Sequence, residues 1–112
     1  MSYNILYTPE FSKEIKRLLK KYPSFKKDFS LLLQSLQQHP LQGFSLGNNF
    51  YKIRLAISGK MSGKSGGARI ISFVKIIDEE IILISLYDKS LKETLSDKEI
   101  KERLNKFKRS RG

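Results

Sequence analysis

Residues 50–89 read FYKIRLAISGKMSGKSGGARIISFVKIIDEEIILISLYDK, and they carry the strongest indications of the fold class. It contains three runs rich in β-branched and aromatic residues, 50–58, 68–77 and 80–89, which predict three strands. Asp78 and Glu79 separate the last two runs and predict a tight antiparallel hairpin. A glycine-rich segment, SGKMSGKSGGAR, joins the first two. We therefore expect a mainly antiparallel sheet whose strands pair in chain order.

The sequence before this stretch predicts one strand and two helices. Residues 3–7, YNILY, form a short strand-like run. Thr8, Pro9 and Glu10 then have the pattern of an N-cap, a first helical proline and a first-turn acid. Two stripes of apolar residues at helical spacing follow, with Pro23 between them, and they predict a helical hairpin that covers the sheet.

The sequence after the three strand-like runs predicts a short final helix. Residues 96–99, SDKE, have the pattern of a capping box, and apolar residues at helical spacing follow. The predicted order is strand, two helices, three strands and a helix. We therefore expect one α+β domain over residues 1–112, with about four strands in a mainly antiparallel sheet and the helices on one face.

Composition favours a polyanionic partner. The chain has 22 Lys and Arg against 11 Asp and Glu, a net charge of +11, and no acidic residue occurs between Asp28 and Asp78. Nucleic acid is favoured over a membrane as the partner. The lysines of the two predicted helices fit a solubilising surface. No apolar run nears the length of a membrane span and no secretory signal is evident, so we expect a cytoplasmic protein.

Composition also limits the chemistry. The chain has no cysteine, which excludes disulfides, zinc–thiolate sites and cysteine nucleophiles. Its single histidine, His39, excludes a histidine-rich metal site and is expected to be a capping or surface residue. We therefore expect neither a metal nor a cofactor.

The glycine-rich segment is not a nucleotide-binding P-loop. It contains Gly63-Lys64-Ser65, but Ser58 stands where a P-loop has its first glycine, and a strand-like run follows instead of a helix. Its glycines are expected to supply positive φ angles in a hairpin connection. That role leaves Lys60 and Lys64 unexplained, and both are candidates for phosphate contacts.

Five residues on or beside the strands form the candidate site. Strand alternation places Lys52 and Arg54 on one face, and Arg69 follows the glycine-rich segment. Tyr87 and Lys89 are two residues apart and are expected to point the same way. Together they predict a basic groove in which arginines and lysines bind RNA phosphates and a tyrosine stacks on a base.

Such a groove could bind RNA or cleave it. Cleavage without a metal requires deprotonation of the 2′-hydroxyl, stabilisation of the charged phosphorane and protonation of the leaving 5′-oxygen. The base would be a lysine whose pKa is lowered by neighbouring positive charges, a tyrosine or a carboxylate. The residues alone leave plain phosphate binding equally open.

The element order and the segments FYKIRLAI, SGKMSGKSGGARIISFV, ILISLYDKS and LSDKEIK resemble the RelE superfamily of bacterial toxins, most closely its HigB-like branch. The resemblance covers essentially the whole chain. It implies a RelE-like fold and a ribosome-dependent mRNA endonuclease that cuts mRNA in the A site through the 2′-hydroxyl. It also implies an antitoxin partner, usually with a helix-turn-helix domain.

The resemblance implies roles for individual residues. Arg69 matches the arginine that stabilises the transition-state phosphate, and Lys52 and Arg54 match basic positions that bind or activate the scissile nucleotide. Lys89 matches a basic residue after the last strand. Lys60 and Lys64 match basic residues of the loop that bind the RNA backbone.

The chain departs from the family pattern near its C-terminal end. Some relatives carry a tyrosine or histidine there as acid, base or stacking partner, whereas this sequence has Leu95. Tyr87, Glu93 and Asp97 remain candidates for that role. Two alternative functions also stay open, a ParE-like DNA gyrase poison and a noncatalytic RNA-binding protein.

Overall fold

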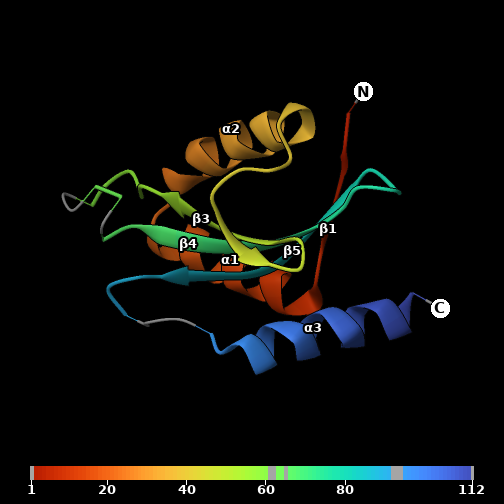
Figure 1. Cartoon of the computed structure of the whole chain (residues 1–112). Coiled ribbons are helices and arrows are strands. Elements are labelled where there is room, and N and C mark those ends of the chain that lie inside the picture. Colours follow the sequence, from red (N-terminus) through yellow and green to blue (C-terminus); the bar gives the residue numbers. More distant parts are fainter. Residues whose placement is uncertain (1, 61–62, 65, 92–94, 112) are drawn as a thin grey trace.

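A computed structural model describes residues 2–60, 63–64, 66–91 and 95–111. The described residues form one five-stranded sheet and three helices (Figure 1). Their order is β1 (Asn4–Tyr7), α1 (Pro9–Lys21), α2 (Phe25–Gln38), β2 (Phe44–Gly47), β3 (Phe50–Leu55), β4 (Ala68–Lys75), β5 (Glu80–Asp88) and α3 (Asp97–Ser110). The expected α+β fold is confirmed. In the described part of the chain, no helix is long and apolar enough to span a membrane.

The sheet has the strand order β1-β5-β4-β3-β2. β2, β3, β4 and β5 pair antiparallel in chain order, as expected, and β1 pairs parallel to β5 at the opposite edge. The expectation of about four strands missed β2. This strand has only four residues, all exposed, so it lacks the buried apolar alternation by which strands are recognised in a sequence.

The ends of the long strands also differ from the expectation. β4 ends at Lys75, so Ile76 and Ile77 lie in the turn before β5, and Ile77 is almost fully exposed. Glu79 adopts a positive φ of 52° in that turn. The hairpin around Asp78 and Glu79 is confirmed, but two β-branched residues belong to the turn because the chain reverses before they can pair.

α1 and α2 pack against one face of the sheet. The Thr8 hydroxyl caps α1 by accepting a hydrogen bond from the Phe11 amide, at 3.1 Å, and it donates one to the Ile84 carbonyl of β5. The cap therefore anchors the start of the helix to the sheet. The apolar stripes of both helices meet inward-facing strand residues in the main core, which includes Phe11, Phe25, Phe29, Ile53, Ile70 and Leu83.

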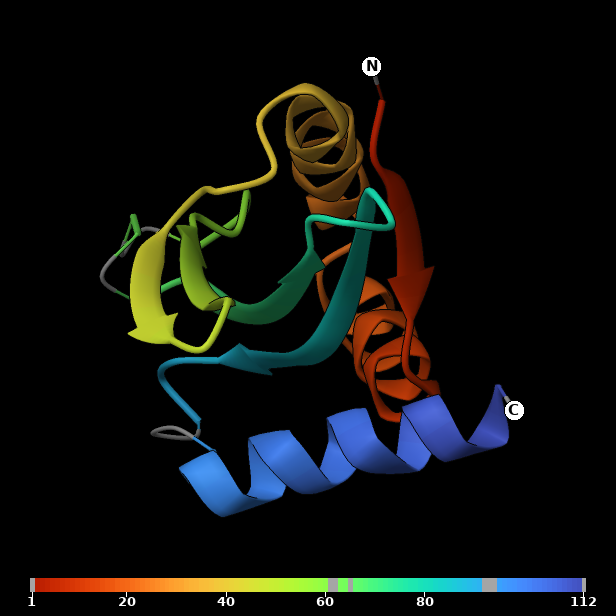
Figure 2. The same ribbon diagram turned by 45° about the vertical axis from the view of Figure 1, so that its right-hand side comes forward.

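α3 packs on the opposite face, so the expectation that all helices cover one face is wrong. Ile100 and Leu104 of α3 join Phe50, Ile71 and Ile82 in a second, smaller core. Figure 2 shows α3 below the sheet and α2 above it. The periodicity of a helix shows which of its sides is apolar, but not which face of a sheet that side will cover.

Candidate functional site

Three predicted site residues lie side by side across three strands. Arg54 of β3 is the cross-strand partner of Arg69 of β4, and Arg69 is the partner of Tyr87 of β5. Directly opposed residues in antiparallel strands project to the same face. We call Arg54, Arg69 and Tyr87 the strand-end row. It lies on the same face as α3, two residues beyond Ile71 toward the glycine-rich loop.

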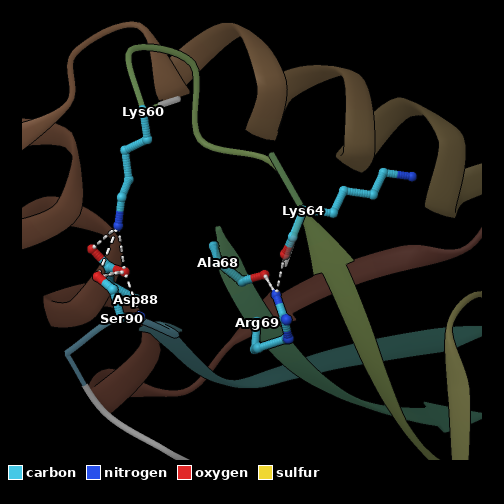
Figure 3. Close-up of polar contacts among 6 residues, drawn as sticks. All are labelled: Lys60, Lys64, Ala68, Arg69, Asp88 and Ser90. Carbon is cyan, nitrogen blue, oxygen red and sulfur yellow. Dashed lines mark hydrogen bonds and ion pairs between the residues drawn. The ribbon is translucent and has the colours of Figure 1, made fainter. Parts of the chain in front are cut away.

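Arg69 is the most constrained member of the row. Only 4% of its surface is exposed, and one guanidinium nitrogen donates to the carbonyl oxygens of Lys64, at 2.8 Å, and Ala68, at 3.1 Å (Figure 3). Burial and the adjacent charge of Arg54 lower the pKa of Arg69 below its ordinary value, while Tyr87 acts in the opposite sense. The guanidinium still carries its charge, because arginine is not deprotonated in proteins. Two cationic side chains therefore lie next to each other.

Lys52 and Lys89 border the row differently. Lys52 is half-buried, pairs with Ile71 across β3 and β4, and shares the face of Arg54. Lys89 lies in the turn just after β5, where its side chain is exposed and its backbone amide donates to the Gly67 carbonyl at 2.9 Å. The backbone of Lys89 thus joins the end of β5 to the residue that precedes β4.

Lys60 does not join the row. Its ammonium donates to both carboxylate oxygens of Asp88, at 2.9 and 3.1 Å, and to the Ser90 hydroxyl at 2.8 Å. Figure 3 shows this cluster apart from Arg69. Both side chains of the ion pair are mostly buried. Because a carboxylate already neutralises Lys60, we do not carry it into the RNA-binding surface that we propose.

Asp88 was missed by the sequence reasoning. Burial by itself would raise the pKa of its carboxyl, but hydrogen bonds from Lys60 and Ser90, with the charge of Lys60, lower it overall. The signal in the sequence was slight, a single acid at the end of an apolar strand. Asp88 ties the start of the glycine-rich loop to the end of β5, and the Lys89 amide ties the end of the loop to the same place.

Lys64 contacts Arg69 through its backbone and not its side chain. Figure 3 shows its carbonyl directed at the guanidinium and its ammonium directed away. The side chain is exposed and available to a polyanion. Gly59 and Gly63 have the expected positive φ angles, of 95° and 61°. Gly67 has a different role, because a Cβ there would collide with the Leu55 carbonyl oxygen.

Tyr87 is only 7% exposed, so its ring is not an open platform for a base in this structure. Its buried hydroxyl has no hydrogen-bond partner among the described residues. Asp97 lies at the start of α3, where it lines a small cavity with Gly47 and Phe50, away from the row. Leu95 is buried in the α3 core. Glu93 lies outside the described residues.

The remaining predicted features concern metals and His39. In the part of the chain that the structure describes, no group of three or more His, Cys, Asp and Glu residues is placed to hold a metal ion. His39 is exposed at the C-cap of α2, where its amide donates to the Ser35 carbonyl at 2.8 Å, as expected for a capping residue.

Comparison with known proteins identifies the fold. No family model matches the sequence, and no curated protein matches it. Among solved structures, the chain is similar to the E. coli toxin RelE, in a double arginine-to-alanine mutant solved in the free state. The TM-score is 0.62 and the sequence identity 16%, over 95% of this chain and 98% of that one. The chain therefore has a RelE-like fold.

Proposed function

We propose that this chain is the toxin of a type II toxin–antitoxin module and acts as a ribosome-dependent mRNA endonuclease. It would cut mRNA in the A site by attack of the 2′-hydroxyl, without a metal. The proposal includes a cytoplasmic location and membership of the HigB-like branch, which the segments around the glycine-rich loop support. The RelE-like fold supports the toxin class.

One observation carries the proposal, the adjacent guanidinium groups of Arg54 and Arg69. Arg54 and Arg69 are cross-strand partners, and repulsion from the positive charge of Arg54 contributes to the lowered pKa of Arg69. A phosphate between them would relieve this repulsion and accept hydrogen bonds from both. The benefit is greatest in the pentacoordinate state, where the phosphate carries more negative charge than in the substrate.

The mechanism requires Arg69 to exchange partners. In the free chain one nitrogen of its guanidinium donates to the carbonyls of Lys64 and Ala68, which are neutral acceptors. Phosphate oxygens make stronger, charge-assisted hydrogen bonds, so the substrate can displace these carbonyls. The 2′-oxygen then attacks phosphorus, the bond to the 5′-oxygen breaks, and the products carry a 2′,3′-cyclic phosphate and a 5′-hydroxyl. Tyr87 and Lys52 are the candidates within the site for proton transfer.

The proposed partners are the ribosome with its mRNA and an antitoxin encoded beside the toxin. The net charge of +11 suits the first, because RNA phosphates bind clustered lysine and arginine. The same charge suits an acidic antitoxin, whose binding would also relieve self-repulsion. The family resemblance suggests an antitoxin with a helix-turn-helix domain.

The test compares the parent chain with Arg69→Ala on ribosomes programmed with a defined mRNA, and maps cuts by primer extension. We expect the parent to cut in the A-site codon and Arg69→Ala to cut about 100-fold more slowly or worse. Arg54→Ala is the companion variant, because Arg54 is exposed and its removal leaves no buried gap. Arg109→Ala, an exposed arginine on α3, is the matched control and should cut like the parent.

Circular dichroism checks that each variant is folded. If the folded Arg69→Ala and Arg54→Ala chains cut as well as the parent, the catalytic assignment is wrong. If the parent leaves mRNA intact, the endonuclease proposal itself fails, and a DNA supercoiling assay then examines the gyrase alternative. Product ends other than a cyclic phosphate and a 5′-hydroxyl would exclude the 2′-hydroxyl route.

A further inference from the structure

A cavity of about 260 Å³ lies between α1 and the C-terminal end of β5. Tyr87 of the strand-end row lines it, and its other lining residues lie outside the row. Three of its lining residues are leucines, Leu18 of α1, Leu86 of β5 and Leu91 in the turn that follows. Leu91 is 70% exposed, although burying an apolar side chain away from water lowers the free energy. The cavity is therefore an apolar pocket with one leucine exposed at its edge.

The acidic groups in this pocket are already engaged. Glu14 accepts hydrogen bonds from the Leu86 amide, at 3.0 Å, and from Arg103 of α3, at 3.1 Å. The Asp88 carboxylate accepts hydrogen bonds from the Lys60 ammonium and the Ser90 hydroxyl. Neither carboxylate is available to neutralise the basic residues beside the pocket or to pair with the polar edge of a ligand.

The basic residues beside the pocket carry unneutralised charge. Arg17 and Lys21 of α1 line it, and both are exposed. Among the described residues neither forms an ion pair, although the Lys21 ammonium lies 5.6 Å from the centre of the Tyr22 ring. After Pro9, every exposed residue of α1 is basic: Lys13, Lys16, Arg17, Lys20 and Lys21. A solubilising surface usually mixes acidic and basic residues, whereas this stripe carries positive charge alone.

We propose that this pocket, with Arg17 and Lys21 at its rim, binds an acidic, apolar segment of a protein partner. An apolar side chain of the partner would fill the pocket and cover Leu91, and carboxylates on either side would pair with Arg17 and Lys21. Such a combination of a buried apolar anchor and a charged rim is typical of protein interfaces. The inference rests on the proposed function only in taking this partner to be the antitoxin.

The pocket suits a protein segment better than an RNA base. A base has a polar edge that loses its hydrogen bonds to water when it is buried, and burial without replacements is costly. Here the two carboxylates are occupied, and the lining groups other than the two rim bases are three leucines and Tyr87. The Tyr87 hydroxyl, which has no hydrogen-bond partner among the described residues, is one polar group, whereas a base has several polar atoms to satisfy. A leucine or phenylalanine side chain incurs no such cost.

The experiment measures binding of a fluorescein-labelled acidic peptide to the full chain by fluorescence anisotropy. The probe is a synthetic amphipathic peptide of glutamates with leucines at helical spacing, and its counterpart has every leucine replaced by serine. A single-stranded RNA oligonucleotide serves as the competing ligand class. We expect the leucine-containing peptide to bind at least about tenfold more tightly than the serine peptide, since an apolar anchor is buried.

Two variants of the chain test the pocket, each with a matched control. Leu91→Ser should weaken binding of the leucine peptide about tenfold, whereas Leu31→Ser, which alters a leucine on α2 that is 55% exposed, should not. Reversing the rim charges with Arg17→Glu and Lys21→Glu should also weaken binding at least about tenfold, and most strongly at low salt. The same charge change made with Lys26→Glu and Lys27→Glu on α2 is the control.

Several outcomes would overturn the proposal. One is equal binding of the leucine and serine peptides, and another is no binding of either. Equal losses in the pocket variants and their controls would show a nonspecific charge effect. Loss of RNA binding but not of peptide binding in Leu91→Ser would assign the pocket to a nucleotide. Peptide binding without mRNA cleavage would support the proposed docking pocket and reject the proposed endonuclease activity. Cleavage of mRNA without peptide binding would support the endonuclease and reject the docking pocket.

Discussion

At the scale of a residue, the buried guanidinium of Arg69 is positioned to bind an anion. The Arg69 side chain is almost completely buried and lies next to Arg54, and one of its guanidinium nitrogens donates to two uncharged carbonyls. A buried cation beside a second cation is costly, and an arriving anion recovers part of that cost. This is why the assignment of the site depends on Arg69 more than on the exposed lysines around it.

Asp88→Asn should destabilise the chain by about 1–3 kcal/mol at neutral pH, because charged hydrogen bonds to Lys60 and Ser90 are lost. The pKa of Asp88 is lowered on folding, so its contribution is fully present above the unfolded value of about 3.9 and is lost as the pH falls through the folded value. Urea unfolding of both chains at several pH values should therefore show a difference that shrinks in acid.

Asp78→Asn is the control for this measurement, because the ion pair of Asp78 with Lys75 is exposed. It should change the free energy of unfolding much less than Asp88→Asn does. A difference between parent and Asp88→Asn that stays constant down to strongly acidic pH would contradict the role given to the ionised carboxylate.

Gly67→Ala should destabilise the chain by about 1–3 kcal/mol, because the new Cβ would meet the Leu55 carbonyl oxygen and lie 3.0 Å from Ala56 Cα. These are backbone atoms, which cannot move aside cheaply. Gly63→Ala is the comparison. Its φ of 61° strains an alanine, but nothing lies within 4 Å, so we expect a smaller loss, of about 1 kcal/mol. Thermal unfolding that ranks the two variants in the reverse order would contradict this reasoning.

At the scale of an element, α3 depends on its first turn. The Ser96 hydroxyl accepts from the Glu99 amide at 3.1 Å, and the Glu99 carboxylate accepts from the Ser96 amide, which completes the predicted capping box. The helix buries only Ile100 and Leu104 fully against the sheet. A helix with so few buried side chains relies more than usual on its cap.

Ser96→Ala should cost about 1 kcal/mol, the usual value for loss of an N-cap hydroxyl. Hydrogen exchange of the α3 amides should accelerate, while exchange in β4 and β5 should change less, since the core around α1 and α2 is untouched. Ser30→Ala, at an exposed position inside α2, is the matched control and should not accelerate exchange in α3. Unchanged exchange in α3 of Ser96→Ala would show that packing alone holds the helix.

At the scale of the whole molecule, the sheet has two different faces. α1 and α2 bury one face in the main core, and α3 covers the other around Phe50, Ile71 and Ile82. The strand-end row lies on the α3 side, and the proposed docking pocket lies beside α1. Tyr87 belongs to both, so a partner protein and an RNA would meet neighbouring surfaces of one small, strongly basic chain.

Binding of a single-stranded RNA oligonucleotide should weaken steeply as salt rises, because the chain carries a net charge of +11. A plot of log affinity against log salt concentration should be linear, and Arg54→Ala should reduce its slope by about 0.7, the value for one phosphate contact on a single strand. Arg109→Ala is the control. An unchanged slope in Arg54→Ala would mean that the exposed arginine of the row does not contact RNA phosphate.

Most of the helices and strands could be predicted from the amino-acid sequence, because their signals are local. The cap at Thr8, the capping box at Ser96 and the hairpin at Asp78 and Glu79 each depend on neighbouring residues, and all three are confirmed. Strand alternation also predicted that Lys52 and Arg54 share a face. The exposed strand β2 was missed because no buried pattern marks it.

How these elements meet depends on contacts between residues far apart in the chain. The tertiary structure placed α3 on the face opposite α1 and α2, paired Lys60 with Asp88, and buried Arg69 beside Arg54. It also closed α1 over the end of β5 to form the pocket at Leu91. These features join residues far apart in the chain, and strand register and the choice of face set them. Alternation along one strand shows which of its residues share a face. It does not show which charged residue of a neighbouring strand or loop will lie beside them.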